Sequence, residues 1–587
     1  PFWTTMQWYP HGFDLALTTS IPFISFAVYP ITYFFGPLVA FNIITILSPA
    51  LAATAAMALF HKITRNILSS FVGGYIFGFS PYELGQLQGH LHLDFIGIIP
   101  VLLIMIYLYW HNRTSKKFFI LSFSTLLVFQ FCTSLEIFST FTYCGFLSIL
   151  YWFAIDNDNR SRIMSLFYSL LISYVISLAI CTPYIYYFFS GLITAPAGFP
   201  YATHSMQANL LNYIIPNPTI WYFSIFNTPI NISSTSDAND TYVGIVIFII
   251  ILYYSLRFNL NKIDKVALFT LSTTIILSLG SRIYIGNNQI CFGPWELVKH
   301  LPTLRYALPN RLSLYVWICI AFILTHLIAR LCSDSRRLAA GTIAILSVFS
   351  IIPNITLSNH VFNTTIKNNT FIMKTINSLQ LNGANVLFIP FKSSTYPMFY
   401  QALSGMRFNI EGGYLGQPQS VGLWPVARTL INLYPLADPK IQFSAFLYHY
   451  NVTRIFLLRT SAHYKQWYNL LCRFDYNKKS TPLGTVFFVT HSSQSHILRG
   501  DSASYYNDKN EYDMAKNLIS GFPCIMSRHE QISSVYDSMT SGCTKNIFTI
   551  DDSAYHEYDL IGVNNWTIQA TSKNIKLITN GWYPELK

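Results

Sequence analysis

Hydrophobic residues in the first 352 positions gather into long runs that short polar connections separate. The runs cover residues 38–60, 67–80, 95–110, 118–131, 140–155, 163–189, 243–256, 266–280, 313–331 and 339–352. A membrane-spanning helix needs about 20 residues, so the shorter runs are expected to extend into their flanks. The pattern predicts a polytopic α-helical membrane protein with about ten transmembrane helices.

The polar connections alternate in charge. Thirteen Lys and Arg residues lie in 61–66, 111–117, 156–162, 257–265 and 330–338, and four lie in 1–37, 81–94, 132–139, 190–242 and 281–312. This is the positive-inside pattern of membrane proteins. It predicts that the N-terminal segment, loop 190–242 and everything after residue 352 are extracytoplasmic. Prolines interrupt the apolar stretch 15–37, and another span there would break the alternation, so we interpret 1–37 as an outward loop with interfacial helices.

After residue 352 the pattern changes to short β-branched and aromatic runs. VLFIPF (386–391), RIFLLR (454–459) and TVFFVT (485–490) are typical of strands, and 398–406 and 425–435 are candidate helices between them. Farther along, NWTIQAT and NIKLIT indicate a pair of strands. The sequence thus predicts a multi-pass transmembrane domain at 1–352, an extracytoplasmic α/β domain at 353–497 and a small β-rich region at 498–587.

The composition agrees with a lipid-embedded protein. Charged residues make up 11% of the chain and hydrophobic residues 52%, whereas soluble proteins have about 25% charged residues. The net charge of +12 divides equally between the two parts of the chain, which gives no sign of a nucleic-acid-binding face. Nine cysteines without CxxC spacing argue against a zinc or iron–sulfur site. The chain opens Pro1-Phe2-Trp3, and we expect it to be a piece that begins inside a loop.

The basic residues of the predicted outward connections all lie in 281–312. They are Arg282, Lys299, Arg305 and Arg311. Arg305 and Arg311 directly precede a predicted span, where a guanidinium at headgroup depth can bind a phosphate or pyrophosphate bidentately. The alternative is that these arginines contact ordinary lipid phosphates.

Glu136 is the only formally charged side chain between Phe118 and Ile155, and it lies at the predicted turn between two spans. A carboxylate this close to hydrocarbon is costly and therefore a candidate functional group, suited to acid–base work or to binding sugar hydroxyls. The alternative is a carboxylate that reaches water or caps a helix.

The outward connection FGFSPYELGQLQGHLHLDF (77–95) contains His90, His92 and Asp94. Two histidines at i and i+2 do not share a helix face, so metal binding is weakly supported. A hydrogen-bonding surface for a sugar or headgroup and a purely structural connection both fit. Asp14, the only acid of 1–37, is either a site residue or a helix cap.

Several of these motifs together resemble a known family. WYPHGFDL, FSPYELGQLQGHLHLDF, SLEIF and LPTLRYALPNRL follow one another in the order seen in large bacterial membrane proteins similar to GT-C glycosyltransferases. NVLFIPF, YQALSGMRFNIEGGYLGQ and YHYNVTRIFLL continue the resemblance into the extracytoplasmic part. The resemblance spans most of the chain through short motifs.

The resemblance implies an inverting transfer of a sugar from a polyprenyl-phosphate donor to an extracytoplasmic envelope glycan or lipid, in the bacterial inner membrane. The usual catalytic Asp of this superfamily follows its first helix, a stretch that we do not find in this chain. The candidate catalytic residues are Glu136 and Asp14, and the candidate donor-phosphate ligands are Arg305, Arg311 and Lys299. The candidate cavity residues are Tyr82, Gln88, His90, His92 and Asp94. Some members of the superfamily use a divalent cation, so such a cofactor stays open.

Two other classes compete with an enzyme. A lipid flippase or transporter would favour ionisable residues at mid-membrane, and a non-catalytic envelope-assembly protein would use its exported part to bind glycan. The sequence contains no phosphate-binding glycine loop and no GxSxG elbow, so a nucleotide-driven enzyme or pump is unsupported.

Overall fold

The chain divides into two compact units. The computed structural model describes residues 2–490 apart from 11, 18–19, 88, 195–206, 224–240, 287, 302, 305–306, 355–368, 392–395, 462 and most of 414–449, and beyond residue 490 it describes four strands. The helical unit comprises residues 19–185 and 200–364, and the sheet unit comprises residues 1–18, 186–199 and 365–587. Residues 1–18 thus belong by contact to the sheet unit, whereas the sequence division at residue 352 places them in the transmembrane domain.

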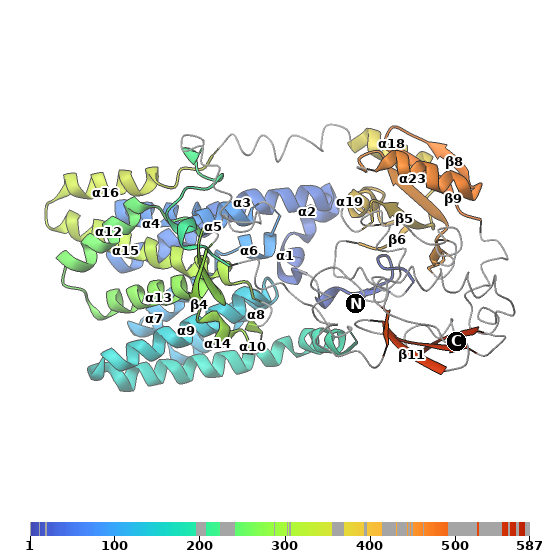
Figure 1. Ribbon diagram of the computed structural model, residues 1–587. Helices are drawn as coiled ribbons and strands as arrows, with labels where there is room; N and C mark the ends of the chain where they lie inside the picture. The colour runs from blue at the N-terminus through green and yellow to red at the C-terminus, as the bar shows by residue number, and fades with distance from the viewer. Residues whose placement is uncertain are drawn as a thin grey trace. The chain divides into compact units, whose positions relative to one another are not determined.

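Each of the ten apolar runs forms a helix. The helices are α3 Pro37–Thr64, α4 Ile67–Gly78, α7 Ile98–Trp110, α8 Lys116–Phe131, α9 Leu135–Ile155, α10 Arg160–Thr194, α12 Ile245–Arg257, α13 Lys262–Ser278, α15 Ser313–Ser333 and α16 Arg337–Phe349. Figure 1 shows many of them side by side with their axes roughly parallel. In the described part of the chain, five segments are long and apolar enough to cross a membrane: Pro37–Thr64, Leu91–Trp110, Leu135–Ile155, Asn157–Ser190 and Pro309–Ser333. The mostly helical fold is confirmed, and the count of ten spans stays a prediction.

Helix α15 forms the centre of the helical unit. In its most apolar window 83% of the residues are buried, against 33% to 50% in the other four long segments. Helices α3 and α4 pack closely because α4 presents glycines to α3. A Cβ atom at Gly74 would lie 2.6 Å from the Ala53 carbonyl oxygen, and one at Gly78 would lie 2.4 Å from that of Pro49. This GxxxG spacing lets two helices approach until their backbones touch.

The prolines of 15–37 begin helices instead of interrupting them. Pro22 and Pro30 lie in the first turns of α1 (Pro22–Ala27) and α2 (Tyr29–Phe35), where no intrahelical N–H bond is lost. The aromatic side chains of Phe26, Tyr33 and Phe34 are 82%, 71% and 74% exposed. Exposed aromatic rings on short helices are typical of a membrane interface, and the interfacial placement stays a prediction.

The sheet unit contains the strands that the sequence predicts. β5 (Asn385–Ile389), β7 (Arg454–Leu458) and β9 (Gly484–Phe488) match the three apolar runs, and β6 (Asn409–Glu411) and β8 (Asn477–Ser480) complete a sheet of order β6-β5-β7-β9-β8. β5 pairs in parallel with both β6 and β7, whereas β9 is antiparallel to β7 and β8.

Helices cover both faces of this sheet. α18 (Asn369–Ser378) and α19 (Tyr396–Leu403) pack with Val386 and Phe388 on one face, and α23 (Tyr464–Leu471) packs with Leu387 and Ile389 on the other. The candidate helix 398–406 is thus found as α19, and the candidate helix 425–435 lies outside the described residues apart from Leu430.

The N-terminal segment extends the sheet beyond β6. Gln7 bridges in parallel to Ile410, and the Gln401 side chain donates to the backbone carbonyls of Met6 and Phe408 at 2.9 and 2.7 Å. β1 (Trp3–Thr4) and β2 (Phe13–Asp14) form a hairpin within this segment. Because the Gln7–Ile410 and Gln401–Met6 contacts join residues about 400 positions apart, no local pattern indicates them.

A separate antiparallel sheet lies near the end of the chain. It has the order β10 (Ile525–Ser527), β11 (Tyr555–Leu560), β12 (Asn564–Ala570) and β13 (Ile575–Asn580). β12 and β13 are the pair that NWTIQAT and NIKLIT predict.

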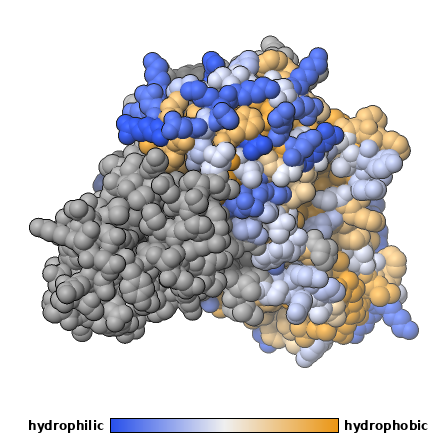
Figure 2. Space-filling model, turned by 90° about the vertical axis from the view of Figure 1, so that its right-hand side faces the viewer, coloured by the Kyte–Doolittle hydropathy of each residue, from blue (hydrophilic) through white to orange (hydrophobic). Residues whose placement is uncertain are grey.

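Hydrophilic residues of the described surface are densest along the upper edge of the view in Figure 2.

Candidate functional site

Glu136 and Arg311, two residues with different predicted roles, contact each other. Glu136 lies in the first turn of α9, which Ser134 caps by accepting from the Ile137 N–H at 3.3 Å. One carboxylate oxygen accepts from the Leu308 N–H at 2.9 Å, and the other accepts from Arg311 Nη1. The side chains of Glu136 and Arg311 are 14% and 15% exposed. Half-buried ion pairs of this kind are held more firmly than surface pairs.

Hydrogen bonds between α9 and α15, which both pack on α13, hold this pair in place. Arg311 belongs to a 3₁₀ turn, Pro309–Leu312, that leads directly into α15. Inward from the pair, the hydroxyls of Thr140 and Tyr315 lie 2.8 Å apart, and Tyr315 also donates to the Ile137 carbonyl at 3.2 Å. Two buried hydrogen bonds thus fix the relative position of the helices that carry Glu136 and Arg311.

The connection 80–95 folds back onto the helical unit through two short helices. α5 (Pro81–Gln86) packs on α15, and α6 (Leu91–Asp94) packs on α3. Tyr82 is buried and donates to the Leu93 carbonyl at 3.1 Å. His92 lies near enough to Arg311 for their charges to interact, and its ring meets that of His90 edge-on at 6.1 Å. Of the predicted cavity residues, His92 thus lies within electrostatic range of Arg311.

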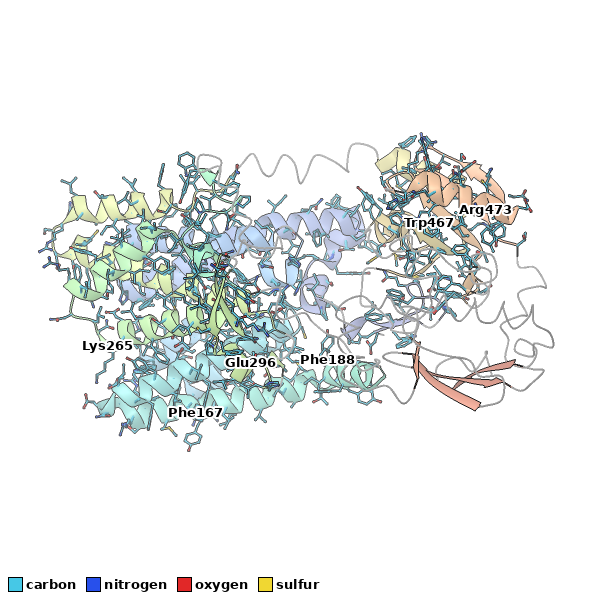
Figure 3. The ribbon with its side chains drawn as sticks, viewed as in Figure 1. Phe167, Phe188, Lys265, Glu296, Trp467 and Arg473 are labelled. Atoms are coloured by element: carbon cyan, nitrogen blue, oxygen red, sulfur yellow. The ribbon has the colours of Figure 1, made fainter. Side chains whose placement is uncertain are left out.

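The remaining predicted residues lie elsewhere or outside the described chain. Asp14 belongs to the sheet unit and accepts from the Ala16 N–H at 2.8 Å, so it caps the 3₁₀ turn Leu15–Leu17. Lys299 pairs at 2.5 Å with Glu296 on α14 (Trp295–Val298), which Figure 3 labels. Arg305 and Gln88 lie outside the described residues.

The sequence interpretation missed Glu83. Its carboxyl is fully buried on α5, as is that of Asp94 on α6, and the two side chains are close enough to interact. Burial first and the neighbouring Asp94 second raise the pKa of Glu83 well above its ordinary value. The available signal was the presence of two acids eleven residues apart in one outward connection.

The described residues do not form a divalent-cation cage. No group of three or more His, Cys, Asp and Glu side chains comes together in the part of the chain that the structure describes. Glu83 and Asp94 are two carboxyls, whereas Ca²⁺ takes six to eight oxygen ligands and Mg²⁺ takes six in octahedral geometry.

Comparison with known proteins gives structural neighbours only. No protein-family model and no curated protein matches the sequence. Similar solved structures include the archaeal oligosaccharyltransferase AglB from Archaeoglobus fulgidus in complex with an inhibitory peptide and a dolichol-phosphate (TM-score 0.41). Two others are the oligosaccharyltransferase of that organism in complex with Zn and sulfate (0.42) and tethered to an acceptor peptide containing the NVT sequon (0.45). Each is 11% identical and covers 92% of this chain and 76% of the solved chain.

Proposed function

We propose that this chain is a membrane glycosyltransferase of the GT-C type. It moves a sugar from a polyprenyl-phosphate donor to an extracytoplasmic glycan or lipid acceptor, with inversion at the anomeric carbon. The observation that supports this most directly is the Glu136–Arg311 pair. It holds a guanidinium at the start of α15, at one end of a membrane-length segment, where the phosphate of a lipid-linked donor would lie.

The proposed reaction needs a cation and a proton acceptor. The acceptor hydroxyl oxygen attacks the anomeric carbon, the bond from that carbon to the donor phosphate breaks, and the hydroxyl proton passes to a base. Arg311 stabilises the charge that develops on the leaving phosphate, as Arg305 and Lys299 would. Glu136 orients Arg311, and Glu136 and Asp14 are the candidate bases. The 80–95 connection, with Tyr82, His92 and Asp94, supports the cavity.

The positions of the charges favour an enzyme over a transporter. In each of the five membrane-length segments, every Asp, Glu, Lys and Arg lies within six residues of one end. Examples are Lys62 in Pro37–Thr64, Glu136 in Leu135–Ile155 and Arg330 in Pro309–Ser333. A transport route would favour ionisable groups near the middle of such segments.

A reconstituted transfer assay tests the proposal. The chain is placed in liposomes with a radiolabelled polyprenyl-phosphate sugar and an envelope glycolipid extract, and labelled product is extracted and counted. We expect product with wild-type protein. Arg311→Ala should reduce transfer roughly ten- to hundredfold, the effect of losing a charge-assisted hydrogen bond worth about 1.5–3 kcal/mol.

Two controls complete the assay. Arg311→Lys should recover transfer in part, because an ammonium supplies charge without the planar fork. Lys265 lies in connection 257–265, which is predicted to be on the cytoplasmic side, so Lys265→Ala should leave transfer unchanged. Movement of a fluorescent lipid across the bilayer without sugar transfer would identify a flippase instead.

A further inference from the structure

The buried carboxyl pair of the helical unit has too few hydrogen-bond donors. Glu83 and Asp94 are both fully buried. Glu83 Oε2 and both Oδ atoms of Asp94 have no donor among the described residues. The Ser48 hydroxyl of α3 lies 3.5 Å from Glu83 Oε1, but its single hydrogen serves the shorter 2.8 Å bond to the Asp94 backbone carbonyl. If both groups were ionised, two buried hydrogen-bond acceptors would face each other without a donor between them.

We propose that Glu83 and Asp94 share a single proton, and that this carboxylic acid–carboxylate pair latches α5 to α6 within the 80–95 connection. With one proton between them, the two side chains become donor and acceptor, and one negative charge is removed from the interior. Two unpaired carboxylates in contact would each cost several kcal/mol of desolvation and would repel each other. Sharing a proton is how close carboxyl pairs avoid this cost.

The neighbouring groups do not offer another way to neutralise the pair. The titratable and charged groups near the connection include Tyr82 on α5, His90 and His92 at α6, Tyr315 on α15 and Arg311 before α15. Arg311 is engaged with Glu136, and Tyr82 donates to Leu93. On the side of α3, the nearby polar groups are the hydroxyls of Ser48 and, one turn earlier on the same face, Thr45, whose buried oxygen has no partner among the described residues.

The pair adds a second side-chain contact between α5 and α6, beside the bond from Tyr82 to the Leu93 carbonyl. Glu83 lies on α5, Asp94 lies on α6, and the Ser48 bond connects α6 to α3. His92 is two residues from Asp94 on the same short helix. If the pair separated, α6 would keep its bonds to Tyr82 and Ser48 but would lose the contact between the two buried carboxyls. The latch does not depend on the proposed sugar transfer.

The sign of the pH dependence follows from the raised pKa of Glu83. The folded protein holds a proton that the unfolded chain releases near its ordinary value of 4.5. Stability from the latch is therefore complete below that value and is lost as pH rises through the folded pKa. Thermal unfolding of the full chain in nanodiscs is therefore measured over a series of pH values above 4.5.

We expect the midpoint of thermal unfolding to fall with rising pH in wild type and to change less in Glu83→Gln. The amide can donate to Asp94 without a titrating proton. Asp94→Asn should likewise reduce the pH dependence, because its amide can donate to Glu83 without a titrating proton. Glu83→Ala should instead increase hydrogen exchange in 80–95 at every pH. Glu296→Gln, which removes an exposed acid of the helical unit, is the matched control and should retain the wild-type slope.

Two results would overturn the proposal. One is an equal pH slope in wild type, Glu83→Gln and Asp94→Asn. The other is stabilisation of wild type, but not of Glu83→Gln, by Mg²⁺ or Mn²⁺ at constant pH, which would make the pair a cation site. If the variants do not fold, infrared spectra of wild type provide the test. We expect a protonated-carboxyl band that disappears when the pH is raised. The absence of any such band at pH near 6 would contradict the latch.

Discussion

Arg311 contacts Glu136 across 175 residues of sequence and joins the start of α15 to the first turn of α9. The contact changes the interpretation of both residues. Glu136 is a carboxylate that holds a guanidinium, and Arg311 is a guanidinium whose direction the protein fixes before any ligand binds. Fixing a cation in advance reduces the cost of ordering it on binding. The pair is therefore the best place to test the site.

A double-mutant cycle on this pair should show coupling. Glu136→Gln keeps the size of the side chain and removes its charge, so we expect folded protein with transfer reduced about tenfold or more. Adding Arg311→Ala to Glu136→Gln should cost less than Arg311→Ala alone, with an interaction energy of about 0.5–3 kcal/mol. Transfer rates at equal folded protein give this energy. Strictly additive losses would mean that the two residues act independently.

Glu411 predicts a pH dependence in the sheet unit. Glu411 is the last residue of β6 and is 1% exposed. Neither of its carboxyl oxygens has a hydrogen-bond partner among the described residues. Burial raises its pKa well above 4.5, so stability falls as pH rises through the raised value. Hydrogen exchange of peptides from 385–411 should therefore increase with pH beyond the intrinsic rate. Glu411→Gln should remove this increase, and an unchanged pH profile in that variant would contradict the assignment.

Gln401 predicts how the N-terminal segment is held. Its amide donates to the carbonyls of Met6 and Phe408. Gln401→Ala would leave the Phe408 carbonyl without this donor, at a cost of about 1–3 kcal/mol, whereas the Met6 carbonyl would keep its bond from the Ile410 N–H. We expect faster hydrogen exchange in residues 2–9. Gln7→Ala is a matched control, because the Gln7 amide oxygen has no partner in the described structure. Equal exchange in both variants would show that the Gln401 bonds are not what holds the segment.

Two native cysteines test the predicted topology. Cys291 is exposed on β4 (Asn288–Phe292), in a connection predicted to be outward, and Cys332 lies near the end of α15, in a connection predicted to be cytoplasmic. In variants that retain only one of them, an impermeant maleimide should label Cys291 in intact cells. It should label Cys332 only in inverted vesicles. Labelling of Cys332 from outside would reverse the orientation.

The sequence by itself determined the elements whose signals are local. Each apolar run became a helix, and the runs at 386–391, 454–459 and 485–490 became β5, β7 and β9, because hydrophobic periodicity acts over a few neighbouring residues. The unusual positions of Glu136 and Arg311 were also visible, since a charge beside a long apolar run is costly wherever the chain folds.

Tertiary structure alone decided which of these residues meet. Glu136 and Arg311 lie on elements separated by 175 residues, Met6 meets Gln401 across 395, and residues 1–18 join the sheet unit. Glu83 became a buried partner of Asp94 only because α5 and α6 fold back onto α15 and α3. Contacts between distant segments depend on how helices and strands pack, and the composition of each segment is compatible with many packings. The chemistry of single residues was therefore readable in the sequence, and their pairing required the fold.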